Sequence, residues 1–155
     1  MKKILIITIL AFVAMVLAAC SENNNTTGAA VCNDPTGCEV SSNSVSIPLD
    51  DLSDQAQFFE YVDNGVKIKY FAVLGSDGEV RTAFDACDVC GGSKGYEQVG
   101  TDIKCRNCGK VFKIDGLGSK NKGYGCWPSF LPHTVNDGQV IIQASDLQSG
   151  SHRFA

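Results

Sequence analysis

Four cysteines occur in two matching short motifs, and their spacing is typical of a metal site. The motifs are Cys87-Asp-Val-Cys90-Gly91 and Cys105-Arg-Asn-Cys108-Gly109, with 14 residues between them. Two thiolates two residues apart can bind one metal from a tight turn, and the following glycine can adopt the left-handed backbone that such a turn needs. Two such turns, here called knuckles, supply four soft ligands in a near-tetrahedral array. The sequence therefore predicts a metal centre at Cys87, Cys90, Cys105 and Cys108.

The ligand type leaves the metal open between zinc, a single iron ion and an iron–sulfur cluster. A closed four-thiolate site is commonly structural zinc, whereas iron would make the site redox-active. Thiol–disulfide exchange is a third use of C-x-x-C, but it requires one low-pKa cysteine at a helix N-terminus, which paired knuckles on hairpins do not offer. The chain has no G-x-S-x-G motif, and we interpret His133 and His152 as surface or edge residues. We therefore expect a non-catalytic redox or metal-binding component rather than an enzyme.

Cys126 is the odd thiol among the eight cysteines. A single free cysteine in an oxidising compartment needs an explanation. Three are open: a buried and inert thiol, a disulfide partner of Cys32 or Cys38, or an additional or exchanging ligand of the metal.

The N-terminus has the features of a targeting signal. A short positive segment, Met1-Lys2-Lys3, precedes an almost entirely apolar stretch over residues 4–19 that is too short for a stable transmembrane span. The sequence Leu17-Ala18-Ala19-Cys20 resembles the bacterial lipobox, in which the signal is cut before a cysteine that is then lipidated. We expect a signal peptide over residues 1–19 and lipidation at Cys20. The lipid would anchor the protein in the cell envelope, on the extracytoplasmic side of a bacterial membrane.

Residues 20–44 are rich in Asn, Thr, Ser and Gly, and we interpret them as the lipidated cysteine and a flexible tether. Within this stretch, Pro35 and Gly37 favour a turn between Cys32 and Cys38. The compartment is oxidising, so a small Cys32–Cys38 disulfide loop is the prediction.

Residues 45–155 have the length and patterning of one small, mostly β, antiparallel domain with the two knuckles on hairpin loops. The triplet Asn136-Asp137-Gly138 is a strong hairpin signal. One short helix is expected at about 53–61, with Ser53 as its N-cap. Strands are expected at 66–73, 80–84, 96–99, 103–104, 110–114, 133–135 and 139–143.

The chain carries a formal net charge of −4, but its charges are unevenly distributed. Seven basic residues lie between 91 and 122, namely Lys94, Lys104, Arg106, Lys110, Lys113, Lys120 and Lys122. An exported lipoprotein has little access to nucleic acid, so we expect no nucleic-acid partner. The bases either stabilise a thiolate site of net negative charge or belong to an ordinary solvated face.

The ordered combination of motifs resembles the FtrD-like membrane iron–sulfur proteins, which are associated with bacterial iron-uptake permeases. The resemblance rests on Phe84-Asp85-Ala86-Cys87-Asp88-Val89-Cys90-Gly91, on Cys105-Arg106-Asn107-Cys108-Gly109, and on the glycines leading to Cys126-Trp127-Pro128. It covers about residues 45–154. It implies cluster or metal binding and a redox role beside a permease for Cys87, Cys90, Cys105 and Cys108, and extends this role to Cys126. Many relatives look like integral membrane proteins, whereas this chain has only a lipidated signal.

Two functions follow from these observations. The first is a membrane-anchored iron or iron–sulfur protein that transfers electrons or handles metal in iron transport, with an iron permease or a redox protein as its partner. The second is an envelope lipoprotein in which zinc stabilises an interaction module. The resemblance favours the first.

Overall fold

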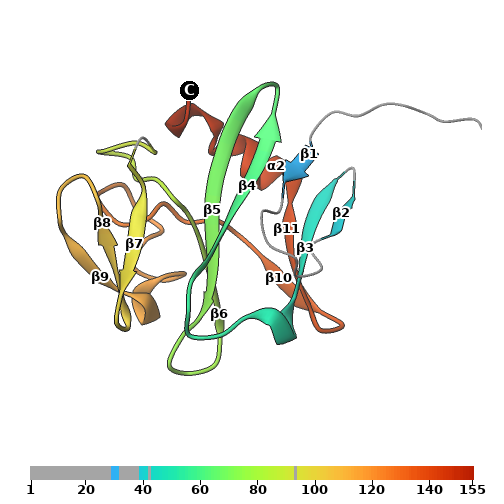
Figure 1. Cartoon of the computed structure of the whole chain (residues 1–155), viewed down its shortest axis with the longest axis horizontal. Coiled ribbons are helices and arrows are strands. Elements are labelled where there is room, and N and C mark those ends of the chain that lie inside the picture. The colour runs from blue at the N-terminus through green and yellow to red at the C-terminus, as the bar shows by residue number, and fades with distance from the viewer. Residues whose placement is uncertain (1–28, 32–38, 42, 93) are drawn as a thin grey trace, which may run out of the picture.

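The computed structural model describes residues 29–31, 39–41, 43–92 and 94–155, whose strands form three antiparallel sheets (Figure 1). The first sheet has the order β1 (Ala29–Val31), β4 (Gln57–Asp63), β5 (Val66–Leu74) and β6 (Val80–Phe84). The second has the order β10 (Thr134–Asn136), β11 (Gln139–Gln143), β3 (Ser44–Pro48) and β2 (Glu39–Ser41). The third has the order β7 (Tyr96–Val99), β8 (Asp102–Cys105) and β9 (Val111–Lys113).

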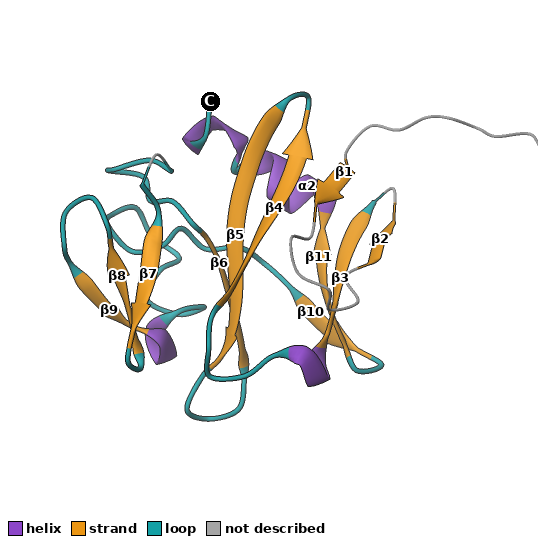
Figure 2. Ribbon diagram, in the orientation of Figure 1, coloured by secondary structure: helices purple, strands orange, loops and turns teal. Residues whose placement is uncertain are grey.

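Helical structure is sparse within these ranges (Figure 2). It comprises α2 (Ala144–Ser149) and three single 3₁₀ turns, η1 (Leu49–Asp51), η2 (Ile114–Gly116) and η3 (Ser151–Arg153). The expected mostly β, antiparallel fold with one short helix is confirmed. No helix in the described ranges is long and apolar enough to cross a membrane.

The first sheet is the middle layer, and β5 is buried on both of its faces (Figure 1). Ile68 and Tyr70 pack in one cluster with side chains of the second sheet and of α2. Phe71 and Val73 point the other way and pack in a separate cluster with the third sheet. A strand with a core on each side needs a continuous apolar run rather than strict alternation, and Tyr70–Leu74 supplies one. The third sheet, which carries the knuckles, is thereby fixed to the rest of the molecule.

The helix expected at 53–61 is wrong, because most of this segment is strand β4. Phe59 and Tyr61 are buried while their neighbours are partly exposed, which is the alternation of a strand with one buried face. Asn64 and Gly65 both have positive φ, as the two-residue hairpin to β5 requires. This Asn-Gly pair is a hairpin signal as strong as Asp137-Gly138, which makes the same kind of turn between β10 and β11.

Two short strands precede residue 45. Strand β1 pairs with β4, and β2 pairs with β3. Both strands fall within 20–44, the stretch that the sequence analysis assigned to the tether, so two parts of this stretch take part in sheets.

Asp85 connects the first knuckle to the third sheet. It follows β6, and its backbone N–H donates to the carbonyl of Lys69 at 2.8 Å. Its carboxylate accepts the backbone N–H of Tyr96, the first residue of β7. Gly95, with φ of +66°, brings the backbone against this carboxylate, at the place where a Cβ would lie. The knuckle and β7 therefore depend on a residue without a side chain at position 95.

We expect Gly95→Ala to destabilise the protein more than Gly100→Ala. Both glycines have φ near +60°, but a Cβ at Gly100 would meet nothing within 4 Å. Gly100→Ala should therefore lower the free energy of unfolding only by the left-handed backbone cost of about 1–2 kcal/mol. Gly95→Ala should cost about 1–3 kcal/mol more, because its methyl group overlaps the Asp85 carboxylate. Urea unfolding of the two variants measures the difference, and equal losses would contradict the assigned role of Gly95.

Candidate metal centre

The two knuckles have the same backbone turn. The N–H of Gly91 donates to the carbonyl of Cys87, and the N–H of Gly109 donates to the carbonyl of Cys105, each at 2.9 Å. The two glycines have φ of +65° and +75°, so the predicted left-handed backbone is confirmed at both. The second knuckle lies in the β8–β9 hairpin, whereas the first links β6 to β7 and so joins two sheets.

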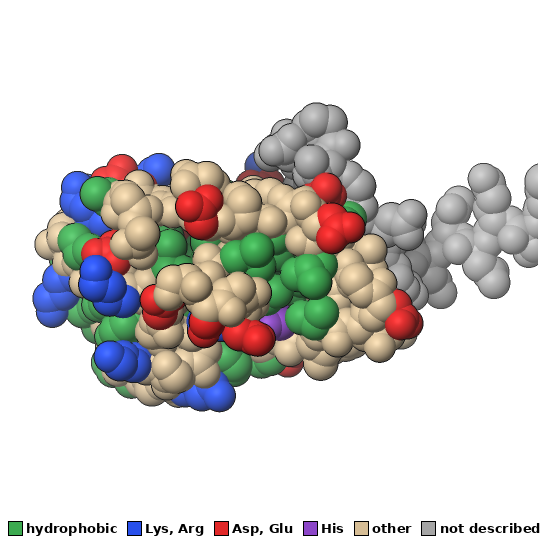
Figure 3. Space-filling view, turned by 90° about the horizontal axis from the view of Figure 1, so that it is seen from below, with side chains coloured by type: hydrophobic (Ala, Val, Ile, Leu, Met, Phe, Trp, Pro, Cys, Tyr) green, Lys and Arg blue, Asp and Glu red, His purple; other side chains and the backbone are tan. Residues whose placement is uncertain are grey.

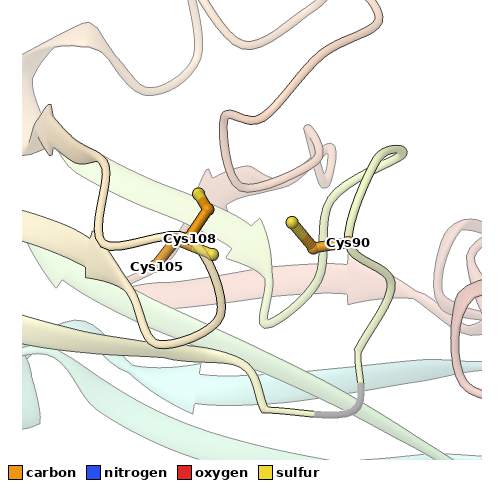
Figure 4. A group of neighbouring side chains, drawn as sticks. All are labelled: Cys90, Cys105 and Cys108. Atoms are coloured by element: carbon orange, nitrogen blue, oxygen red, sulfur yellow. The ribbon is translucent and has the colours of Figure 1, made fainter.

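Three of the predicted ligands converge. The Sγ atoms of Cys90, Cys105 and Cys108 lie within 4.8 Å of one another (Figure 4). Cys90 faces the other two from the opposite loop, so one sulfur comes from the first knuckle and two from the second. Tetrahedral metal–sulfur bonds of about 2.3 Å place sulfur atoms about 3.8 Å apart. The spacing and the all-sulfur donor set therefore fit a metal held jointly by the two knuckles.

Cys87 and Cys126 lie outside this group of three. Cys87 is buried beside it, and its Sγ accepts the backbone N–H of Cys90 at 3.1 Å. Cys126 is half-buried, with its Sγ 4.0 Å from the Lys110 ammonium. Their roles as ligands stay predictions.

The other predicted cysteine sites cannot be placed. Cys20, Cys32 and Cys38 lie outside the described residues. Lipidation at Cys20 and the Cys32–Cys38 disulfide therefore also stay predictions.

The surroundings of the thiols affect their protonation differently. The Asn107 side chain lowers the pKa of Cys90, but burial and the neighbouring Cys87 and Cys105 outweigh it and raise the pKa to about 11. The pKa of Cys108 is lowered, first by a hydrogen bond from the backbone N–H of Lys110. A bound cation would favour the thiolate form of all these ligands. Without metal, the surroundings therefore favour the thiolate form of Cys108 and the thiol form of Cys90.

The glycine-rich segment that follows η2 passes the first knuckle and then packs on the third sheet. The Tyr124 hydroxyl donates to the carbonyl of Asp88 in the first knuckle at 3.4 Å. Two residues later, the carbonyl of Cys126 accepts the Tyr96 hydroxyl at 2.7 Å. Trp127 then packs on Phe112, with ring centroids 4.8 Å apart. The segment thus covers one side of the metal end.

The C-terminal turn η3 also holds the first knuckle. The Arg153 guanidinium donates to one carboxylate oxygen of Asp88 from Nε at 3.0 Å and from a terminal nitrogen at 2.7 Å. Both side chains are less than one-fifth exposed. The Arg153 carbonyl also accepts the N–H of Gly92, one residue past the knuckle. Asp88 lies between the two cysteines, so this contact restrains the knuckle itself.

The two histidines are not among the converging groups. His133 Nδ1 lies 2.8 Å from the Thr82 hydroxyl, and the exposed His152 contacts the carbonyl of Ser149. The sequence analysis missed Asp88 and Arg153 as supporting residues. The position of Asp88 between two predicted ligands is a usable signal, but no local pattern marks Arg153.

We expect Arg153→Gln to speed the loss of metal to an excess of chelator. It would leave the half-buried Asp88 carboxylate without its ion pair, and supporting contacts of this kind are worth about tenfold or more in metal affinity. The control is Lys67→Gln, because Lys67 is 68% exposed and its ion pair with Glu60 joins β5 to β4 without involving either knuckle. The release rate, followed by a chromogenic chelator, should rise only for Arg153→Gln. Equal rates in both variants and the wild type would contradict the role of Arg153.

Comparison with known proteins identifies the family. A family model described as "Membrane iron-sulfur containing protein FtrD-like" matches residues 49–154. No match was found among the curated proteins or among the solved structures. The matched range holds both knuckles, the glycine-rich segment that follows η2 and the C-terminal turn that restrains the first knuckle. The chain belongs to the FtrD-like family of membrane iron–sulfur proteins.

Proposed function

We propose that this protein is a membrane-anchored, extracytoplasmic electron-transfer protein of iron transport, with iron at the two knuckles. The observation that carries the proposal is the convergence of the Cys90, Cys105 and Cys108 sulfurs from two separate loops. The family description supplies iron and membrane association. The N-terminal apolar segment and the lipobox support an anchor outside the cytoplasm.

Cys87, Cys90, Cys105 and Cys108 are the residues that would hold the metal. Iron bound by thiolates supplies a one-electron redox couple whose potential depends on hydrogen bonds to sulfur and on solvent exposure. The backbone N–H of Cys90 donates to the Cys87 sulfur, and the backbone N–H of Lys110 lowers the pKa of Cys108. Such donors stabilise negative charge on sulfur and so favour the reduced state.

A zinc-stabilised interaction module is the second candidate, and the sulfur spacing is compatible with it. Three sulfurs within 4.8 Å of one another suit one ion. In a four-iron cluster each thiolate binds a different iron, which holds the sulfurs further apart. One ion could be zinc or iron. If the metal is iron, the sulfur spacing therefore favours a single iron ion over a four-iron cluster. It does not distinguish iron from zinc.

We expect the full-length protein, purified without oxygen, to contain iron and to show visible absorption that bleaches with dithionite. Elemental analysis gives the metal-to-protein ratio, and electron paramagnetic resonance separates a single ferric ion from a cluster. Colourless protein with one zinc per chain would overturn the electron-transfer proposal in favour of the structural module.

We expect Cys87→Ser to abolish stable metal binding and Cys126→Ser to retain it. Cys87 occupies in the first knuckle the position that Cys105 occupies in the second, and the two residues make the same turn. Cys126 belongs to a different segment, with its sulfur beside an ammonium group rather than in the three-sulfur group. The metal content of each variant after gel filtration tests the two expectations. If Cys87→Ser kept its metal and Cys126→Ser lost it, Cys126 rather than Cys87 would be the fourth ligand.

A further inference from the structure

We propose that the surface around the exposed Cys108 is a docking site for an acidic one-electron carrier protein. We call this surface the knuckle face and define it by Val89, Lys94, Cys108, Lys110, Lys122 and Tyr124. The electron-transfer part of the inference rests on the proposed function. The charge recognition does not, because it depends only on side chains of this chain.

The predicted ligands differ in exposure, and this difference determines the side from which a partner protein can approach the metal. Cys87 and Cys105 are only 1% and 2% exposed, and both pack in the cluster between the first and third sheets. Cys108 is exposed, on the outer turn of the β8–β9 hairpin. A partner can therefore approach the metal through Cys108, whereas the buried ligands are covered by the protein.

The charges near the metal end are largely unpaired. Lys104 and Arg106 pair with Glu97, and Lys113 pairs with Asp102. Four other exposed lysines make no ion pair with any described residue, namely Lys94, Lys110, Lys120 and Lys122.

The distribution of charge over the whole molecule also makes the metal end basic. In Figure 3, Lys and Arg side chains gather at the end that the third sheet forms, and Asp and Glu predominate toward the other end. The whole chain nevertheless carries a net charge of −4. This separation would orient an acidic partner toward the metal before contact.

Apolar side chains lie among these bases. Val89 is 56% exposed in the first knuckle, Val111 is 52% exposed beside the second, and Tyr124 is 83% exposed on the segment that passes the first. Lys122 and Tyr124 also line a hollow together with Asp88. Scattered apolar groups within a charged rim suit a small, short-lived interface, as electron carriers use, rather than a permanent one.

A protein partner fits this face better than an anionic lipid surface. Val89 and Tyr124 stand on loops and Val111 begins strand β9, and none of the three belongs to an amphipathic helix of the kind that inserts into lipid. Glu97 and Asp102 lie among the bases, which a uniformly negative membrane would repel. A partner with its own pattern of acidic and neutral groups can avoid them. In the docked complex one electron passes between the metal and the partner's redox group, so one centre is oxidised as the other is reduced and no bond is made or broken.

The test compares two full-length variants of equal net charge. Lys94→Gln/Lys122→Gln removes two positive charges from the knuckle face. Thr134→Glu/Gln143→Glu adds two negative charges at exposed positions of the second sheet, away from the knuckles. None of these four residues is a predicted ligand, so metal content serves as a check on both variants.

The first measurement is independent of the metal's redox activity. Fluorescence anisotropy records the binding of a fluorescein-labelled decaglutamate peptide at low salt. We expect affinity to fall about threefold to tenfold in the knuckle-face variant and to change less in the control. Equal loss in both variants, or no loss in either, would overturn the docking site.

The second measurement tests electron transfer. Stopped-flow oxidation of the dithionite-reduced protein by ferricyanide should slow about threefold or more in the knuckle-face variant. Oxidation by the cation hexaammineruthenium(III) should not slow. The ferricyanide difference should disappear at 1 M salt, where the screening length is about 3 Å. A protein with no reducible centre would defeat the proposed function while the peptide result still decides the docking site.

The third measurement tests lipid as the occupant. Full-length protein is placed in nanodiscs of neutral or of anionic phospholipid, and peptide binding is repeated. If the knuckle face is free to bind a protein, the wild type should bind the peptide more tightly than the knuckle-face variant in both kinds of nanodisc. Loss of that advantage in anionic nanodiscs alone would overturn the proposal in favour of a membrane contact.

Discussion

Bringing like-charged thiolates together is the constraint on which the metal end depends. Thiolates less than 5 Å apart repel one another, and the pKa of Cys90 is raised by burial and then by its neighbours Cys87 and Cys105. A cation removes this repulsion, so metal binding and the folding of the metal end are coupled. The third sheet is small, and it is held by its cluster with the first sheet, by hydrogen bonds between Gln98 and the backbone of Asp54 and Ala56, and by the knuckles.

Two contacts hold the first knuckle in place, which favours the close approach of the thiolates. Asp85 connects it to β7 through the backbone of Tyr96, and Asp88 connects it to the C-terminal turn through Arg153. Burial raises the pKa of Asp85 to about 6, although the Tyr96 N–H and the charges of Lys69 and Arg106 oppose this. The second knuckle needs less support, because its hairpin already fixes it. The first knuckle has no hairpin, since it crosses from one sheet to another.

The packing of the knuckles also leaves two of the predicted ligands buried and one exposed to solvent. Cys87 and Cys105 belong to the core, while Cys108 lies on the surface beside unpaired lysines. A purely structural zinc site gains nothing from an exposed ligand within a basic rim, whereas an electron-transfer site needs one edge of its metal within reach of a partner. The acidic body and basic metal end of the chain would then act together in orienting that partner.

The sequence by itself determined the features that rest on local chemistry. The duplicated C-x-x-C-G spacing predicted the knuckles, their left-handed glycines and a meeting of four sulfurs, of which three converge, and Asp137-Gly138 predicted its hairpin. Together with the ordered motifs around Cys126, these residues also identified the family. Each of these features depends on residues close together in the chain, where turn geometry and ligand reach leave few alternatives.

Only the tertiary structure decided the features that depend on distant partners. Residues 57–61 have a plausible helical pattern, but pairing with β5 makes them a strand, and propensity is too weak to oppose a full ladder of hydrogen bonds. Arg153 reaches Asp88 from 65 residues away. The first cysteine of each knuckle is buried and the second is less so, but only the packing of the sheets decides that Cys108 is exposed while Cys90 is half-buried.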